Sequence, residues 1–189
     1  EGGHGVVVLS PNAIKRLSTF HPERPMPKIF RLVKNGKLIE GVYEGETLNT
    51  PSMFCVADAL DSLMWIKEIG GLTETIRRSN ENFKCLQGWV DKTPWIENLV
   101  SDPRNRSNTS VCLKFSDERL ISLIPDEKTR FVKEFVALLE AENAAFDIKG
   151  HRNAPPGLRI WCGATINLDD IQKLLPWLEY CFHEIISSY

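Results

Sequence analysis

The sequence predicts an α/β fold. Short runs rich in β-branched residues, such as GVVVLSP at residues 5–11, are typical of buried strands. Longer segments repeat apolar residues at helical spacing, and in the second half of the chain the two kinds of segment alternate. With 189 residues, of which 42% are hydrophobic, the chain can build one ordinary core or two small lobes.

The segment after the first strand predicts a hairpin. Residues 20–28 carry three prolines within six positions, which favours an extended loop. Residues 28–41 then show two short apolar runs around Asn35 and Gly36, a pair that suits a tight turn between antiparallel strands.

Two helices are expected next. Thr50 is a good N-cap and Pro51 suits the first helical position, so a helix should run from there to the two glycines at residues 70–71. Thr73 is the expected cap of a second helix, which should end before the Thr-Pro pair at residues 93–94. We interpret this second helix as the bridge between two lobes.

The second half predicts strands and helices in alternation, after a polar loop at residues 102–110. Because proline inside a helix costs about 3 kcal/mol, Pro176 should start a helix of its own. The expected strands are residues 110–116, 144–149 and 158–164, and the expected helices are residues 125–143, 167–175 and 176–189.

Composition excludes several classes of function. The net charge of -2 gives no general attraction to nucleic acid or to an anionic membrane, and no apolar run is long enough to span a bilayer. The histidines are scattered and no cysteine pair has CxxC spacing, so no metal site is expected. We interpret the cysteines as free thiols of a cytoplasmic protein: Cys55, Cys85, Cys112, Cys162 and Cys181.

One basic segment is a candidate anion site. The stretch HRNAPPGLRIWCGAT begins at His151, and residues 148–168 contain no acid. Arg152 and Arg159 can both grip a carboxylate or phosphate if the Pro-Pro-Gly corner at residues 155–157 folds the chain back. On spacing alone an alternative stays open, in which Arg152 is a solvated loop residue and Arg159 pairs with an acid elsewhere.

The start of the first helix is a second candidate. Free N–H groups at a helix N-terminus attract phosphate, and Asn49 and Thr50 add side-chain donors. Most Thr-Pro helix starts serve only as caps, so this feature by itself leaves both interpretations open.

Several stretches together resemble one family. NTPSM, KTPWIENL, RSNTSVCLKF and GHRNAPPGLRIWCGAT, in this order along the chain, are similar to the C-terminal half of the phosphoserine aminotransferases. The resemblance covers essentially the whole chain. It implies the C-terminal half of a fold-type I transferase that uses pyridoxal 5′-phosphate (PLP). Residues 1–95 would then be the end of the large cofactor domain with bridging helices, and residues 96–189 the small C-terminal α/β domain.

The resemblance also implies residue roles. Arg159 matches the arginine that holds the substrate α-carboxylate, and His151 and Arg152 match the pair that meets the substrate phosphate or the distal carboxylate of glutamate. Asn49 and Thr50 match residues that reach the cofactor phosphate of the neighbouring subunit in a homodimer. The implied reaction converts 3-phosphohydroxypyruvate and L-glutamate into O-phospho-L-serine and 2-oxoglutarate, and many bacterial members also act in pyridoxine synthesis.

The family's Schiff-base lysine is missing from this sequence. By the resemblance it lies just upstream of Glu1, so we expect the chain to be a piece of a polypeptide about twice as long, and we assign no catalytic residue within it. Two alternatives remain: another fold-type I enzyme, such as an alanine–glyoxylate or serine–pyruvate aminotransferase, and a non-catalytic binding or dimerisation module.

Overall fold

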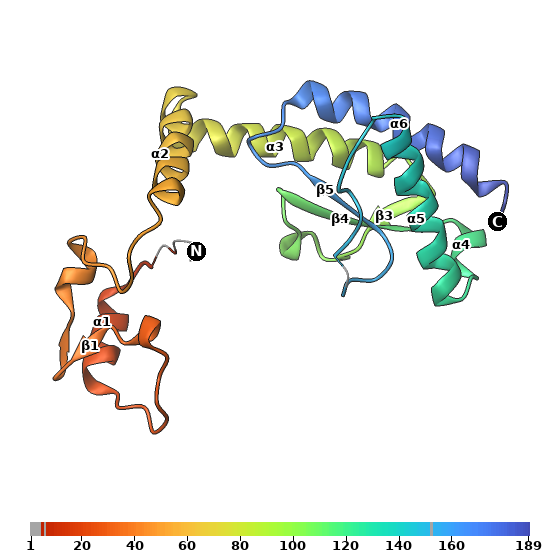
Figure 1. The fold of residues 1–189 in the computed structure, drawn as a ribbon. Helices are drawn as coiled ribbons and strands as arrows, with labels where there is room; N and C mark the ends of the chain where they lie inside the picture. Colours follow the sequence, from red (N-terminus) through yellow and green to blue (C-terminus); the bar gives the residue numbers. More distant parts are fainter. Residues whose placement is uncertain (1–4, 6, 152) are drawn as a thin grey trace. The chain divides into compact units, whose positions relative to one another are not determined.

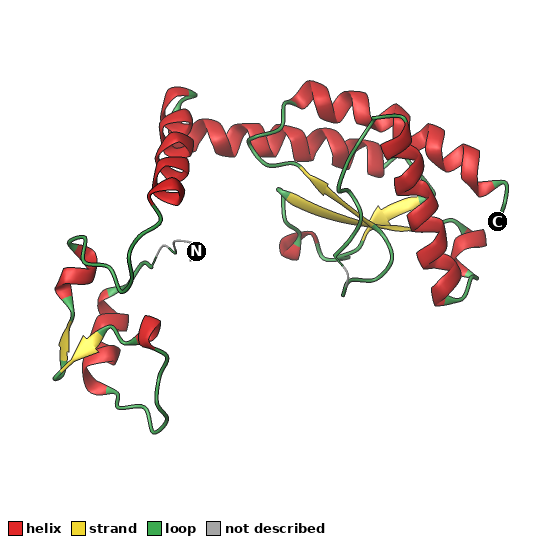
Figure 2. Ribbon diagram, viewed as in Figure 1, coloured by secondary structure: helices red, strands yellow, loops and turns green. Residues whose placement is uncertain are grey.

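The computed structural model describes residue 5, residues 7–151 and residues 153–189 (Figures 1 and 2). The chain divides into two compact units, Glu1–Trp65 and Ile66–Tyr189. This division by contacts falls earlier than residue 95, because the long helix that follows residue 70 packs within the second unit. The expected boundary at residue 95 concerns the domains of a whole enzyme, and it stays a prediction.

The first unit contains the expected hairpin. Strands β1 (Val33–Lys34) and β2 (Lys37–Leu38) pair antiparallel, and the turn residues Asn35 and Gly36 have φ angles of 52° and 73°. Positive φ at both positions is the geometry that Asn-Gly pairs favour. Short 3₁₀ turns at Lys28–Phe30 and Glu40–Tyr43 flank the hairpin.

The prediction of a strand at residues 5–11 is wrong. Gly5 and residues 7–10 pair with no strand in the described part of the chain, and Val8 is 88% exposed. Helix α1 (Pro11–Thr19) begins at Pro11, where the Ser10 hydroxyl accepts a hydrogen bond from the Ala13 N–H at 3.2 Å. A β-branched run becomes a strand only when a neighbouring strand takes up its backbone groups.

Helix α2 (Met53–Glu68) begins later than expected. Its first turn is closed by Ser52, whose hydroxyl accepts from the Cys55 N–H (3.4 Å) and whose carbonyl accepts from the Val56 N–H (3.2 Å). Thr50 is therefore not the cap. The apolar stripe of this helix is uncovered: Met53 is 72% exposed, and no residue is buried in the described part of the first unit.

The second unit contains one antiparallel sheet in the order β3-β4-β5, formed by Ile96–Asn98, Ser110–Phe115 and Leu158–Trp161. β3 was not expected. The strand expected at residues 144–149 is reduced to one bridge between Lys149 and Leu158. Asn143 and Asp147 both have a φ of 53°, and this left-handed backbone interrupts an extended run.

Helices pack on the apolar face of this sheet. α3 (Gly71–Val90) and α6 (Leu168–Ile186) run side by side, and α5 (Pro125–Ala141) packs against α6 (Figure 1). Short turns of helix lie at Pro103–Asn105 and Glu118–Ile121 (α4). Spacing predicts one apolar face on α5, formed by Phe131, Phe135, Leu138 and Leu139. The core includes Phe131, Phe135 and Leu139, and Leu138 is partly buried against it. The cap of α3 is Gly70, with a φ of 117°, so Thr73 lies inside the helix rather than before it.

The two helices predicted at the C-terminus form a single helix, α6. Pro176 lies inside α6, although it cannot donate the backbone hydrogen bond that its position normally supplies. Buried residues on both sides of Pro176, such as Ile171 and Leu178, attach each half of α6 to the same core. Tertiary packing therefore outweighs the cost of the proline.

The cysteines are free thiols, as expected. Burial raises the pKa of the Cys162 thiol to about 12 and that of Cys181 to about 11, so both stay protonated at neutral pH. No helix within the described residues combines the length and the apolar character that a bilayer crossing requires. Within the same residues, no group of three or more His, Cys, Asp or Glu side chains is placed to hold a metal ion.

A carboxylate on α6 joins three elements of the second unit. Glu179 accepts hydrogen bonds from the indole N–H groups of Trp89 (2.8 Å) on α3 and Trp95 (3.1 Å) next to β3. Each carboxylate oxygen accepts from one indole. An indole N–H can only donate, so both contacts require an acceptor on residue 179. Glu179 therefore fixes α6 relative to the α3–β3 junction.

Replacing Glu179 with glutamine should lower the free energy of unfolding by about 1–2 kcal/mol, because the amide NH₂ would face one indole N–H. Urea denaturation measures this change. Glu184→Gln, which alters an exposed carboxylate on the same helix, is the matched control and should be close to neutral. Equal stability of the two variants would contradict a role for the indole contacts.

Candidate functional site

Arg159 lies on the face of the sheet opposite the helices. Along β5, Leu158 and Ile160 are buried, whereas Arg159 and Trp161 are not, as the alternation of a strand requires. Arg159 is paired with Cys112 on β4. Its side chain lines a shallow pocket together with Ser110, Phe146, Asp147, Ile148 and Trp161. A pocket whose lining includes a cation, two aromatic side chains and a hydroxyl can bind a small carboxylate.

Arg159 already has a partner. One guanidinium nitrogen, Nη2, lies 3.2 Å from Oδ2 of Asp147 and donates a hydrogen bond to it. Asp147 directly precedes the acid-free stretch, so the stretch does not keep this arginine unpaired. The sequence alternative in which Arg159 pairs with a distant acid is met in so far as Arg159 has an acidic partner, 12 residues away along the chain. Its other half, a solvated Arg152, lies outside the described residues.

The chain folds back at the Pro-Pro-Gly corner, as expected. The Arg159 N–H donates to the Ile148 carbonyl (2.7 Å), and the Gly150 N–H donates to the Gly157 carbonyl (3.1 Å). These hydrogen bonds join the two ends of the loop that carries the corner, and of this loop the structure describes residues 150–151 and 153–157. His151 lies in this loop, and Arg159 follows it on β5.

The His151 ring is held by the loop backbone. Its Nδ1 accepts from the Asn153 N–H at 3.2 Å, and its carbonyl accepts from the Ala154 N–H at 2.8 Å. With Nδ1 as an acceptor, the neutral ring carries its proton on Nε2, which has no hydrogen-bond partner among the described residues. The second predicted cation of this loop, Arg152, lies outside the described residues.

His151 and Arg159 line two different pockets. The pocket of His151 is formed by the loop and by Thr129 and Val132 of α5, and it also includes Lys149. Sequence reasoning missed Lys149, although it lies inside the acid-free stretch and could have been found there. The two pockets could each bind one anionic group. One group would lie at Arg159, and the other at Lys149 and His151.

Asn49 and Thr50 lie in the first unit, in the loop before α2. Both are exposed, and their side chains form no hydrogen bond within the described part of the chain. An amide NH₂ and a hydroxyl that have no internal partner are available as donors to an anion. The role expected for these two residues stays a prediction.

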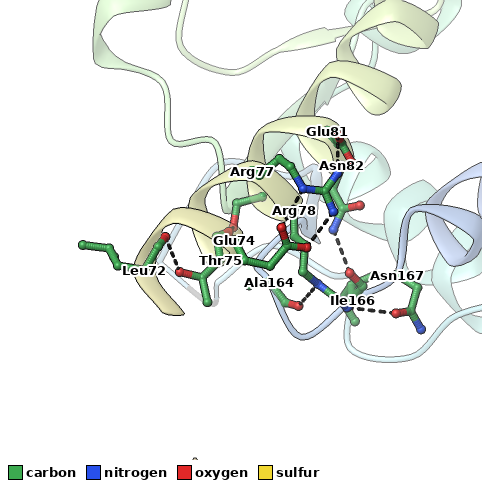
Figure 3. Close-up of polar contacts among 11 residues, drawn as sticks. Leu72, Glu74, Thr75, Arg77, Arg78, Glu81, Asn82, Ala164, Ile166 and Asn167 are labelled. Carbon is green, nitrogen blue, oxygen red and sulfur yellow. Dashed lines mark hydrogen bonds and ion pairs between the residues drawn. The ribbon is translucent and has the colours of Figure 1, made fainter. Parts of the chain in front are cut away.

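Helix α3 holds the segment that follows Arg159 (Figure 3). Arg78 donates to the Ala164 carbonyl (2.8 Å) and to Oδ1 of Asn167 (2.9 Å). Asn82, which is 1% exposed, donates to the Ile166 carbonyl at 2.9 Å and lies 3.4 Å from the Cys162 and Gly163 carbonyl oxygens. These contacts fix residues 162–167, and therefore the end of β5, against α3.

Sequence reasoning missed Asn82. A signal was present, because Asn82 lies one helical turn before Leu86 and therefore on the apolar stripe of α3. A polar side chain on a buried stripe must find partners. Which backbone carbonyls it would find depends on the tertiary structure.

Asn82→Asp should destabilise the second unit by about 2–4 kcal/mol at neutral pH, because a carboxylate would replace a donor among carbonyl oxygens. The folded state would raise the pKa of the new carboxyl above its unfolded value. The loss of stability should therefore shrink as pH falls from this raised pKa toward the unfolded pKa. Urea denaturation at two pH values measures both effects.

Asn80→Asp is the matched control. Asn80 lies on the same helix, is exposed, and uses its Oδ1 as an acceptor for Asn108 Nδ2 at 2.8 Å. An aspartate keeps that acceptor, so this variant should be close to wild type. A similar loss of stability in both variants would refute the donor role of Asn82.

Solved structures of other proteins share this fold. No protein-family model matches the chain. Its fold is that of part of a PLP-bound phosphoserine aminotransferase from Trichomonas vaginalis, with a TM-score of 0.60 over 73% of this chain and 36% of that chain at 22% identity. A phosphoserine aminotransferase from Bacillus circulans subsp. alkalophilus gives a TM-score of 0.62 over 76% of this chain and 36% of that one, also at 22% identity. The chain therefore shares the fold of part of these solved phosphoserine aminotransferases.

The sequence relatives are more specific. The chain is 45% identical over 184 residues to the phosphoserine aminotransferase of Methanosarcina mazei, covering 96% of this chain and 46% of that protein. The corresponding values for Methanosarcina barkeri are 44% over 185 residues, 97% and 47%. The chain is thus a homologue of the phosphoserine aminotransferases over nearly its whole length, and it spans about half the length of these relatives.

Proposed function

We propose that this chain is part of a phosphoserine aminotransferase, which transfers an amino group between L-glutamate and 3-phosphohydroxypyruvate. The observation that carries the proposal is the 45% identity over 96% of the chain. The local geometry supports it, because both substrates carry a carboxylate and one carries a phosphate. The hairpin at residues 148–159 offers a guanidinium and, in a second pocket, a lysine and a histidine.

We assign the α-carboxylate to Arg159. A planar guanidinium binds a carboxylate through two parallel hydrogen bonds, which fixes the orientation of the substrate as well as its position. The phosphate is assigned to His151 and Arg152, as the resemblance implies, with Lys149 as an additional cation. Because Nδ1 is engaged by the loop backbone, the neutral ring can donate from Nε2, which has no partner within the described part of the chain.

The cofactor of the proposed enzyme is PLP, which when bound supplies an electron sink for the carbon that gains or loses the amino group. Asn49 and Thr50 would donate hydrogen bonds to its phosphate. Their fit is chemical: both are exposed donors without an internal partner in the described chain. No lysine of this sequence matches the family's PLP-binding lysine by motif, so we assign no proton transfer to this chain.

The uncovered apolar surface of the first unit supports a proposal on domain organisation and assembly. Exposed apolar side chains on α2, such as Met53 and Phe54, are typical of surfaces that pack against other protein. We propose that residues 1–95 complete a large cofactor domain in a homodimer with its active site at the subunit interface, and that residues 96–189 form the small domain. The family resemblance is the ground for two other proposals, a cytoplasmic location and activity on the phosphorylated pyridoxine precursor as a second substrate.

The test is a substrate comparison with the full-length protein. We expect glutamate formation from phosphoserine and 2-oxoglutarate, and yellow absorbance from bound PLP that changes when phosphoserine is added. Alanine or serine in place of phosphoserine should be poor donors, because they leave the phosphate site empty. A preference for alanine would favour an alanine–glyoxylate type of enzyme, and a protein without bound PLP or activity would favour a non-catalytic module.

A further inference from the structure

We propose that the Asp147 carboxylate binds the Arg159 guanidinium while substrate is absent, and that the substrate carboxylate displaces it on binding. Asp147 thereby sets the affinity for carboxylate substrates. The inference rests on the proposed function, in which Arg159 holds the α-carboxylate. It assigns a role to a residue that contacts the arginine rather than the reacting atoms, so Asp147 is a positioning residue.

The contact between the two residues is of a kind that substrate can displace. It consists of a single hydrogen bond, from Nη2 to Oδ2, at 3.2 Å. The Asp147 side chain is 88% exposed and the Arg159 side chain is 39% exposed. Exposed ion pairs with one contact are weak, whereas a substrate carboxylate can engage both sides of the guanidinium fork.

The backbone holds Asp147 at this position. Its φ of 53° lies in the left-handed region, which Asp and Asn tolerate better than most residues. The next residue, Ile148, accepts a hydrogen bond from the Arg159 N–H at 2.7 Å, so the two segments are tied together beside the pocket. The other residues that line this pocket with them, Ser110, Phe146, Ile148 and Trp161, are uncharged. Asp147 is thus the acid of this pocket.

Two consequences follow for the reaction. While Asp147 is in place, Arg159 is oriented toward the pocket before substrate arrives, so less order has to be created on binding. The substrate carboxylate must then compete with the Asp147 carboxylate and meets its negative charge nearby. The competition acts on binding and not on the chemical step, so it should appear in KM and leave kcat unchanged.

Asp147→Asn in the full-length enzyme tests the inference. Asparagine keeps the size and the tolerance of the left-handed backbone while it removes the charge. We expect KM for glutamate and for phosphoserine to fall about two- to five-fold with kcat unchanged, which is the range that exposed ion pairs support. Because salt screens exposed charges, the difference in KM between wild type and variant should diminish at high ionic strength.

The control is Asp169→Asn, which removes the same charge from another exposed ion pair, that of Asp169 with Lys173 on α6. It should leave both KM values as in wild type. An unchanged or higher KM in Asp147→Asn, or an equal decrease in the control, would overturn the inference while the proposed function stands. A wild-type enzyme that transfers no amino group from phosphoserine would overturn the proposed function and the inference together.

Discussion

Replacing Arg159 with alanine should lower kcat/KM for both glutamate and phosphoserine by about a hundred-fold or more. In the proposed assignment Arg159 donates two charge-assisted hydrogen bonds to the substrate carboxylate, and each would contribute about 1.5–3 kcal/mol. The loss should be the same for both amino donors, because both present an α-carboxylate. Bound PLP should be retained, since Arg159 is not among the residues assigned to the cofactor. Steady-state kinetics and the absorbance of the bound cofactor measure the two effects.

Two further variants make this prediction specific. Arg119→Ala removes another exposed, ion-paired arginine of the second unit, the partner of Asp117, and should leave the kinetics unchanged. Arg159→Lys keeps the charge but loses the planar fork, so its kcat/KM should lie between those of wild type and alanine. Wild-type kinetics in Arg159→Ala would remove this residue from the substrate site.

The second large effect is expected at Gly157. A Cβ atom at this position would overlap the carbonyl oxygen of Leu113 on β4, and it would lie 3.3 Å from that carbonyl carbon. Both partners are backbone atoms of a paired strand, so neither can move aside cheaply. Gly157 also supplies the carbonyl that closes the loop of His151. Gly157→Ala should therefore destabilise the second unit by about 3 kcal/mol and disturb both anion-binding segments.

Thermal unfolding and kcat/KM for phosphoserine together measure the Gly157→Ala effect. Gly88→Ala is the matched control, because a Cβ at Gly88 meets no atom within 4 Å. Gly88 lies inside α3, where alanine is favoured over glycine by about 1 kcal/mol, so this variant should be slightly more stable than wild type. Equal stability and activity of Gly157→Ala and Gly88→Ala would contradict this prediction, because the close approach of residue 157 to β4 would then not exclude a Cβ atom.

Local patterns in the sequence were sufficient for part of the fold. The hairpin at Asn35 and Gly36 follows from two residues that accept positive φ, and α5 follows from the spacing of Phe131, Phe135 and Leu139. In these elements the residues that decide the structure are neighbours along the chain. The fold-back at the Pro-Pro-Gly corner is of the same kind.

Two other predictions failed because the structure of the element depends on residues that are distant in the sequence, and a third failed at a local cap. The β-branched run at residues 5–11 finds no strand to pair with in the described chain, and α6 continues through Pro176 because both halves attach to one core. Thr50 is a good cap by type, but Ser52 has the geometry that closes the first turn of α2. Neither pairing nor packing can be read from the local pattern.

For the candidate site, too, the sequence predicted one part and the tertiary structure decided the other. The sequence by itself determined the residue types that can bind anions, His151, Arg152 and Arg159, and its resemblance to phosphoserine aminotransferases determined their expected roles. Only the tertiary structure decided that Arg159 faces away from the core beside Asp147, and that Asn82 fixes the end of β5. The reason is physical: side-chain chemistry belongs to each residue, whereas the partner of a charge or of a buried donor comes from whichever segment the fold brings next to it.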